Sequence, residues 1–250
     1  MLMKTILLLF LMLPGCLFGQ TQTSQSIDTR AGQSVSMTFE DAAPIRIEVW
    51  EQNTIRVDAS VSINAGENDD AFQIKVDDRA DALKVSTEIV GKKDLPERIM
   101  LHYQDQDHYF TTGDWSHPDV QAFLEKHGRE NMQWMSHGPL INIALTVYVP
   151  KNIDLHVTST FGLIEMQGVT QSLTASSEHG GLDLSVPSSA SYDFGIECEW
   201  GEVYTNLNLE VAPTDQGRML KAEQFVATLN GGGPTIRLTS EHGNVYLRAL

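Results

Sequence analysis

Four segments in the C-terminal part of the chain repeat one pattern. In each segment apolar residues alternate along a strand, a small residue and a ring follow, and a glycine precedes a second alternating strand. Period-two alternation on both sides of a glycine predicts a strand–turn–strand unit. The four glycines are Gly162, Gly180, Gly201 and Gly243; the small residues three positions earlier are Ser159, Ser177, Cys198 and Ser240; the rings one position earlier are Phe161, His179, Trp200 and His242; the apolar residues two positions later are Ile164, Leu182, Val203 and Val245.

This repeat predicts stacked coils. One strand–glycine–strand unit cannot bury its apolar face alone, whereas stacked copies bury a continuous core. We therefore expect a mostly β fold: a single-chain β-solenoid rich in parallel strands, with antiparallel N-terminal strands and one short helical insertion. The glycine is expected to supply a positive φ at the corner, and the small residue to leave room where two strands converge. Residues 229–234 (LNGGGP) look like a degenerate further copy centred on Gly232.

The N-terminal half shows the alternation typical of antiparallel strands. Residues 45–50 and 55–63 alternate apolar and polar side chains, and the short polar segment between them predicts a hairpin with one buried face. The same alternation predicts three more strands at residues 72–76, 83–89 and 141–149.

Residues 104–138 interrupt the strand pattern and read as an insertion. Alternation is lost there, and His, Trp, Met and Asp accumulate. One helix is predicted inside it, because Pro118 suits the first helical position, Asp119 suits the first turn and Gly128 can end the helix. The apolar face of this helix would consist of Val120, Phe123 and Leu124.

Several of these segments together resemble a family of exported bacterial proteins described as putative adhesins. The segments that carry the resemblance are residues 45–50 (IRIEVW), 55–59 (IRVDA), 145–153 (LTVYVPKNI), 158–162 (TSTFG), 229–234 (LNGGGP) and 240–245 (SEHGNV). The resemblance covers residues 35–250 apart from the insertion. It implies a bladed or spiral β-solenoid domain of unknown function in the cell envelope, and it transfers no catalytic residues.

The N-terminus has the features of an export signal. Lys4 precedes an apolar stretch, residues 6–13, that is too short to span a bilayer. We expect residues 1–19 to be removed as a signal peptide. In the alternative, residues 13–16 (LPGC) act as a lipobox that places a lipid anchor on Cys16. The expected location is the periplasm, the outer-membrane surface or the medium.

The mature chain is expected to consist of a lead and one domain. Residues 20–34 are rich in Gln, Thr and Ser, which indicates a flexible lead or a first edge strand. Residues 35–250 would then form the adhesin-like domain, with the insertion at 104–138.

The composition limits the partners. Lys and Arg number 17 and Asp and Glu 33, which gives a net charge of −16. Binding to nucleic acid or to an anionic membrane needs clustered Lys and Arg, so we expect neither as a partner of the folded domain. An unknown protein or a glycan is the expected partner, and no cofactor is expected.

The insertion holds the best candidate for a contact patch. Large apolar side chains gather near the predicted helix at Trp115, Phe123, Trp134 and Met135. We expect these four to contact a partner or, alternatively, to pack the insertion on the solenoid as a cap that protects strand edges. The histidines in and near the insertion have none of the spacings typical of zinc sites, so no metal is expected.

Glu165 and Asp183 are the candidates for catalysis. They share the column three positions after the repeat glycine, and strands about 5 Å apart would bring them near each other, as in enzymes that cleave glycosidic bonds with two acids. The column continues as Tyr204 and Tyr246, and no basic residue is expected beside it, so a solvated sheet face accounts for it better. The ring column that includes His179 and His242 is expected to be a structural stack.

The leading prediction is a non-catalytic, adhesin-like protein of the cell envelope that binds a surface, glycan or protein through its sheet faces or its insertion. One alternative is a polysaccharide-active β-helix enzyme that uses Glu165 and Asp183. The other is a periplasmic accessory protein in envelope signalling.

Overall fold

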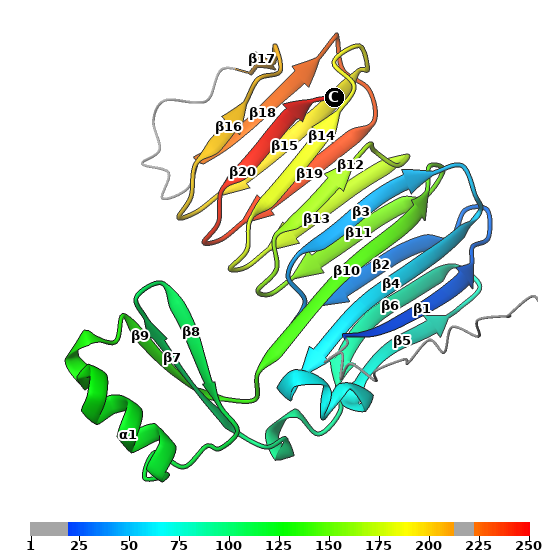
Figure 1. Cartoon of the computed structure of the whole chain (residues 1–250). Helices are drawn as coiled ribbons and strands as arrows, with labels where there is room; N and C mark the ends of the chain where they lie inside the picture. The colour runs from blue at the N-terminus through cyan, green and yellow to red at the C-terminus, as the bar shows by residue number, and fades with distance from the viewer. Residues whose placement is uncertain (1–19, 213–222) are drawn as a thin grey trace, which may run out of the picture.

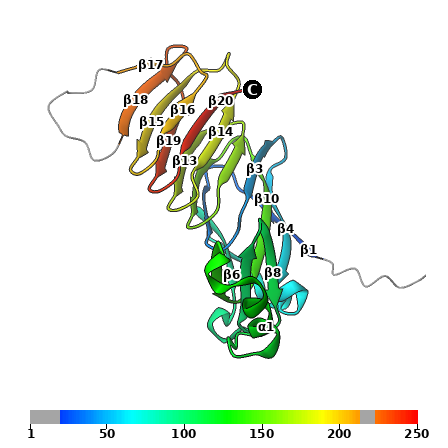
Figure 2. The ribbon, with the colours of Figure 1, turned by 60° about the vertical axis from the view of Figure 1, so that its left-hand side comes forward.

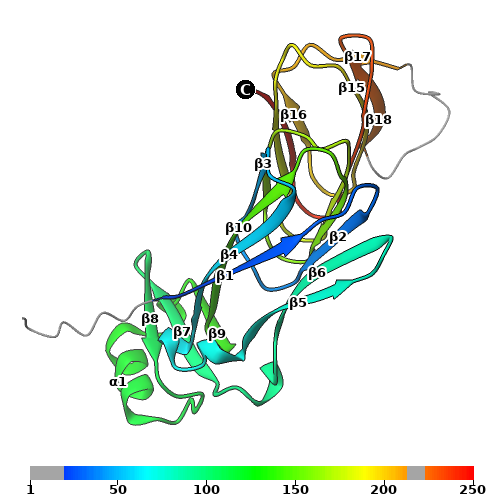
Figure 3. The ribbon, with the colours of Figure 1, turned by 90° about the vertical axis from the view of Figure 1, so that its right-hand side faces the viewer.

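The computed structural model describes residues 20–212 and 223–250. The predicted signal peptide and Cys16 lie outside the described residues. Within them the chain is mostly β, with two large mixed sheets, A and B, that face each other across a hydrophobic core, a small third sheet, C, and one α-helix (Figure 1). Figure 3 shows the strands of sheets A and B as two facing layers. No helix of the described part is long and apolar enough to cross a membrane.

The strands of the three sheets come from distant parts of the chain. Sheet A contains, in spatial order, β1 (Thr21–Asp28), β4 (Thr54–Ile63), β10 (Ile141–Pro150), β3 (Ile45–Trp50), β12 (Ile164–Gln167), β14 (Leu182–Val186), β20 (Val245–Ala249) and β16 (Val203–Thr205). Sheet B contains β17 (Glu210–Val211), β18 (Glu223–Leu229), β15 (Tyr192–Cys198), β19 (Thr235–Ser240), β13 (Ser172–Ser177), β11 (Asp154–Ser159), β2 (Ser34–Phe39), β6 (Ala82–Ile89) and β5 (Phe72–Asp78). Sheet C contains β8 (Gln106–Phe110), β7 (Arg98–Tyr103) and β9 (Trp134–Gly138), and the helix is α1 (Pro118–His127).

Short 3-10 helices lie in the connections. They are η1 (Asn64–Gly66), η2 (Asp69–Ala71), η3 (Lys92–Asp94) and η4 (Arg129–Asn131).

Pairs of parallel strands run in the same order through both large sheets. Each pair gives one strand to sheet B and the following strand to sheet A, in the order β2/β3, β11/β12, β13/β14, β19/β20 and β15/β16. The predicted alignment is confirmed residue by residue in sheet A, where Ile164 pairs with Leu182, Leu182 with Val245, and Val245 with Val203. The small-residue column is also in register in sheet B, in the order Ser159, Ser177, Ser240 and Cys198.

The last pair in the sequence is not the last pair in space. Strand β18 pairs antiparallel with β15 on one side, and β19 pairs parallel with β15 on the other, so β19/β20 lies between β13/β14 and β15/β16. Residues 229–234 therefore connect two strands of sheet B. The prediction that this segment is a further copy of the repeat is wrong, because a copy would send its second strand to sheet A.

The repeat glycines are required by the close packing of successive strand pairs. A Cβ on Gly180 would overlap the backbone of Gly162, and a Cβ on Gly243 would overlap the backbone of Gly181. The expected positive φ is absent at these four glycines and occurs instead at Gly181, with φ 93°. The glycine column is therefore a line of contact between successive backbones.

The small residues in front of these glycines close the turns. The Ser177 hydroxyl accepts hydrogen bonds from the backbone N–H groups of Gly180 and Gly181, at 3.1 and 2.9 Å. In its own turn the Ser240 hydroxyl accepts a hydrogen bond from the Gly243 N–H at 3.2 Å and donates one to the Gly243 carbonyl at 2.6 Å. Cys198 is fully buried at the equivalent position, as the repeat predicts.

The N-terminal strands differ from the predicted hairpin. Strand β10 lies between β3 and β4, parallel to the first and antiparallel to the second, so the hairpin prediction is wrong. Residues 51–53 can connect β3 to β4 past β10, since a residue extends by about 3.3 Å and two strand spacings are about 9.6 Å. Strand β1 pairs antiparallel with β4 and buries Ile27, so residues 21–28 form the edge strand, not a flexible lead.

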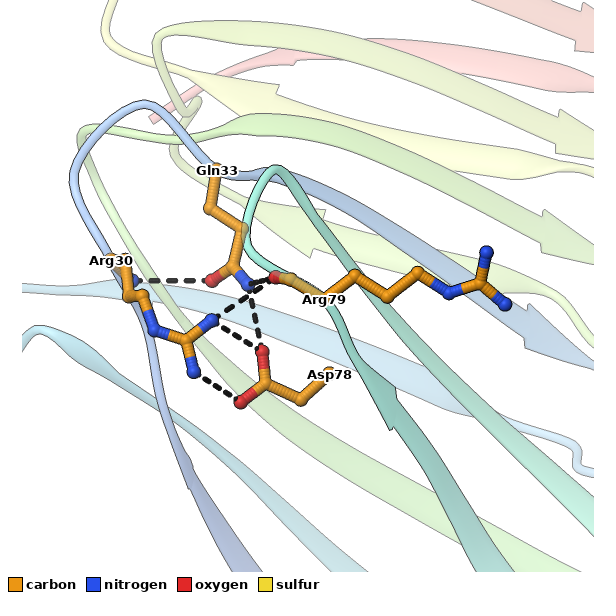
Figure 4. A network of polar contacts seen from close by, with 4 residues as sticks. All are labelled: Arg30, Gln33, Asp78 and Arg79. Atoms are coloured by element: carbon orange, nitrogen blue, oxygen red, sulfur yellow. Dashed lines mark hydrogen bonds and ion pairs between the residues drawn. The ribbon is translucent and has the colours of Figure 1, made fainter.

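A polar network ties two turns of the N-terminal strands together (Figure 4). Arg30 donates two hydrogen bonds to the Asp78 carboxylate, at 2.7 and 2.6 Å. Gln33 Nε2 donates to Asp78 Oδ1 at 2.9 Å and to the Arg79 carbonyl at 2.7 Å. The hydrogen bond from Arg30, and then the one from Gln33, holds the pKa of Asp78 below its ordinary value.

We expect Asp78→Asn to destabilise the protein at neutral pH and to have no effect in strong acid. Because the pKa of Asp78 is lowered in the folded state, its contribution is complete above the ordinary aspartate pKa of about 3.9 and is lost as the pH falls through the folded value. The urea midpoint of the variant should lie below that of the wild type near neutral pH and meet it in acid. Asp77→Asn, which removes an exposed partner of Arg79, is the control; a gap that persists in acid would contradict this account.

Candidate functional site

Sheet C and α1 form a projecting unit, residues Arg98–Gly138, at the end of the molecule that carries the N-terminal strands (Figures 1 and 2). The unit has its own small core, in which Ile99 and Leu101 of β7 pack against Val120 and Leu124 of α1. Strand β7 precedes residue 104, so this unit is larger than the insertion inferred from the sequence. Its sheet was missed because β7 to β9 are short and two of them are sheet edges, where alternation is weak.

The predicted helix is confirmed. It has Pro118 at its N-terminus and Asp119 in its first turn, it buries Val120 and Leu124, and Gly128 is its C-cap. The helix covers the face of sheet C that carries Ile99 and Leu101. No helix of residues 20–212 or 223–250 covers the other face of sheet C.

The structure divides the four predicted contact residues. Trp115 and Phe123 pack against the core of the projecting unit, and the Phe123 ring lies 5.7 Å from that of Phe110. Trp134 and Met135 are 42% and 38% exposed, but as neighbours on β9 they point to opposite faces. The four side chains are therefore not brought together on one surface.

The uncovered face of sheet C carries a cluster that we call the aromatic shelf, made of His102, Asp107, Tyr109 and Trp134. His102 lies opposite Asp107 of β8 and Trp134 of β9. The Trp134 and His102 rings stack with centroids 5.2 Å apart and planes 10° apart. His102 Nδ1 is 2.5 Å from Asp107 Oδ1. The shelf therefore combines exposed rings with a carboxylate held in place.

Tyr109 completes the shelf as an uncharged group. Its hydroxyl donates to Asp107 Oδ2 at 3.2 Å, and the side chain as a whole is 58% exposed. Burial near the hydroxyl, and then the negative charge of Asp107, raises the pKa of Tyr109 above its ordinary value. The phenol is therefore neutral and can offer its ring and its oxygen to a ligand.

A pocket of about 640 Å³ lies beside the shelf, between the projecting unit and sheet A; we call it the junction pocket. Met100, Tyr109 and Ser136 line it from sheet C, while Ser62 of β4 and Asn142 of β10 line it from the outer face of sheet A. Ligand sites commonly have volumes of about 300–1,000 Å³ and lie where two structural units meet.

One buried side chain holds the projecting unit in place. Asn64, 2% exposed, accepts a hydrogen bond from Leu140 N at 2.9 Å and donates to the Pro96 carbonyl at 2.9 Å and to Asn68 Oδ1 at 2.8 Å. Pro96 and Leu140 lie just before and just after the projecting unit. Asn64 also has φ 51°, a conformation that asparagine tolerates better than most residues. Both connections to the unit are thus tied to η1, directly after β4 of sheet A, and Asn64 itself lines the junction pocket.

Glu165 and Asp183 are neighbours on the outer face of sheet A, in register between β12 and β14. Each is paired with an arginine: Arg46 Nε lies 2.8 Å from Glu165, and Arg248 Nε lies 2.9 Å from Asp183. The expectation that no basic residue accompanies this column is wrong, because Arg46 comes from β3, far away in the sequence. The column ends in the stacked rings of Tyr246 and Tyr204, 5.2 Å apart.

The ring column at the corner between the sheets is a stack, as predicted. Phe161 lies 5.4 Å from His179, and His179 lies 5.0 Å from His242 in nearly parallel planes. Trp200 belongs to the last strand pair and is 68% exposed. Across the part of the chain that the structure describes, no group of three or more His, Cys, Asp or Glu side chains could hold a metal ion.

Comparisons with known proteins bear on the fold alone. No protein-family profile and no curated protein matches the chain. The crystal structure of a putative cell adhesion protein from Clostridium sporogenes is similar, with a TM-score of 0.51 and 10% identity, covering 92% of this chain and 100% of that chain. A putative adhesin from Bacteroides fragilis also matches, with 10% identity over 92% of this chain and 97% of that one, but its TM-score of 0.25 supports no argument.

Proposed function

We propose that this protein is a non-catalytic, adhesin-type binding protein of the cell envelope, and that it engages a surface ligand through the aromatic shelf and the junction pocket. In this proposal the stacked strand pairs form a solenoid-like scaffold. The projecting unit presents the binding face at one end of it. Export by the N-terminal segment would place the protein where such a ligand is accessible.

The observation that carries the proposal is the junction pocket. It combines a size suited to a ligand, exposed aromatic side chains and a location between two units whose relative position Asn64 fixes. A preformed site binds at lower entropic cost than one that must be ordered. The similarity in fold to the putative cell adhesion protein from Clostridium sporogenes agrees with a binding role.

The ion pairs of Glu165 and Asp183 favour binding over catalysis. A glycosidase of the two-acid type needs two carboxyl groups that are free to flank the glycosidic bond. Here each of the two carboxylates is engaged by an arginine side chain, Arg46 for Glu165 and Arg248 for Asp183. The pair is better suited to holding adjacent strands of sheet A together.

An adhesion assay tests this proposal. The chain from residue 20 onward, coupled to beads, should retain the beads on cell surfaces or on arrayed glycans and extracellular proteins. The captured ligand should be released intact, without cleavage products. Bead retention equal to that of uncoated beads on every surface, or release of shortened glycans, would contradict it.

A further inference from the structure

We propose that the junction pocket and the aromatic shelf take an uncharged sugar residue of a neutral glycan. This inference rests on the proposed binding function and gives the chemical class of its ligand.

The described residues that line the junction pocket offer no free positive charge to an anionic ligand. Its one arginine or lysine among the described lining residues is Arg98, whose guanidinium group lies 2.6 Å from the Glu67 carboxylate and donates to the Thr111 carbonyl at 2.8 Å. His137, also at the pocket, directs Nε2 to the Gly113 carbonyl at 2.8 Å and lies 3.2 Å from Glu97. With a net charge of −16 on the whole chain, an acidic glycan would be repelled.

The polar groups that the pocket leaves available are uncharged. The side chains of Ser62, Ser136 and Asn142 line it and form no hydrogen bond with another described residue. Ser62 and Asn142 lie opposite each other in register on β4 and β10, and Ser136 faces them from β9. Two hydroxyl groups and an amide can both donate and accept, as sugar hydroxyls require.

The shelf supplies flat apolar surface beside these groups. The Trp134 indole is stacked on His102 through one face and remains 42% exposed, and the Tyr109 ring lines both the shelf and the pocket. The C–H face of a pyranose ring packs on such aromatic surfaces, while its hydroxyls reach the rim. A pocket of about 640 Å³ fits one or two sugar units, since it falls within the range for small-molecule sites.

A peptide ligand is the competing class. It would bind by adding a strand to the free edge of β9, and its affinity would come from backbone hydrogen bonds. Such binding would not use Ser62 or Asn142, which lie on sheet A. The two classes therefore differ in their dependence on these residues.

Isothermal titration of the chain from residue 20 onward tests the inference. The probes are neutral hexose and N-acetylhexosamine oligosaccharides, uronic-acid oligosaccharides of the same lengths, and a library of unstructured peptides. We expect binding of at least one neutral series, weakened at least tenfold by Trp134→Ala and about threefold to tenfold by Asn142→Ala or Ser62→Ala, as for the loss of one hydrogen bond to a neutral group. Trp200→Ala, which removes the exposed ring at the far corner, should leave binding unchanged. Circular dichroism and thermal melting are the controls that check whether each variant is folded.

Other outcomes separate this inference from the proposed function. Stronger binding of uronic-acid oligosaccharides, binding of peptides alone, or neutral binding that is insensitive to Asn142→Ala and Trp134→Ala would overturn the inference. If the coated beads adhere to surfaces while every oligosaccharide series fails, the ligand class is wrong and the adhesin function stands. If the beads adhere to nothing, both are wrong.

Discussion

Gly180→Ala should destabilise the protein by about 3 kcal/mol or more. The new methyl group would overlap the Gly162 carbonyl and lie close to Leu163 N, which are backbone groups in the middle of the stack. Overpacking a well-packed core costs about 1–3 kcal/mol and sometimes more, and backbone atoms cannot rotate aside. The free energy of unfolding from urea titration, with an unchanged m-value, is the measurement.

Gly195→Ala is the matched control within the same stack. Gly195 lies inside β15, and a Cβ there would meet only the Arg237 side chain, at 3.9 Å. Alanine also reduces the entropy of the unfolded chain, so this variant should be neutral or up to about 1 kcal/mol more stable. If both variants lose similar free energy of unfolding, any glycine in these strands would be sensitive to alanine. Backbone contact between successive strand pairs would then not explain the repeat glycines.

Asn64→Ala should cost about 3 kcal/mol of stability and loosen the projecting unit. The substitution removes hydrogen bonds to Pro96, Leu140 and Asn68, each worth about 1 kcal/mol, and places alanine at φ 51°. Because both connections lose their side-chain attachment, and only the backbone bond from the Asn64 N–H to the Leu140 carbonyl remains, amide exchange should accelerate at Leu95, Glu97 and Leu140. Urea titration and hydrogen exchange detected by mass spectrometry measure the two effects.

Asn68→Ala is the control for this prediction, because it removes the Asn68 Oδ1 acceptor and leaves the bonds to Pro96 and Leu140 in place. It should cost about 1 kcal/mol and leave exchange at Leu140 unchanged. Accelerated exchange in the control, or none in Asn64→Ala, would show that Asn64 does not hold the unit.

The repeat predicted the register of the strands but not their order. Every copy presents the same apolar column, so any order of the copies satisfies the packing of Leu182 on its neighbours equally well. The order is decided by β18 and the turn after it, because the turn places β19 on the side of β15 opposite β18. Similarly, the positions of β3 and β4 in the sequence predicted a hairpin because nothing local indicates that β10 enters between them.

The candidate site was only partly accessible from the sequence. Trp134 stands out in the sequence as a large apolar side chain in a polar segment. Tyr109 does not, since its link to Trp134 exists only when β7 pairs with both β8 and β9. Ser62 and Asn142 are ordinary polar residues on strands, and only the fold places them opposite the projecting unit. Arg46 reaches Glu165 for the same reason.

The most direct test of the account compares bead adhesion for two double variants. Tyr109→Ala/Trp134→Ala removes the rings of the aromatic shelf, and Phe161→Ala/Trp200→Ala removes two exposed rings of the corner column. With both variants folded, we predict that the first abolishes adhesion and the second retains wild-type adhesion. Adhesion that survives the first variant and is lost in the second would contradict the account and place the binding face on the stacked sheets.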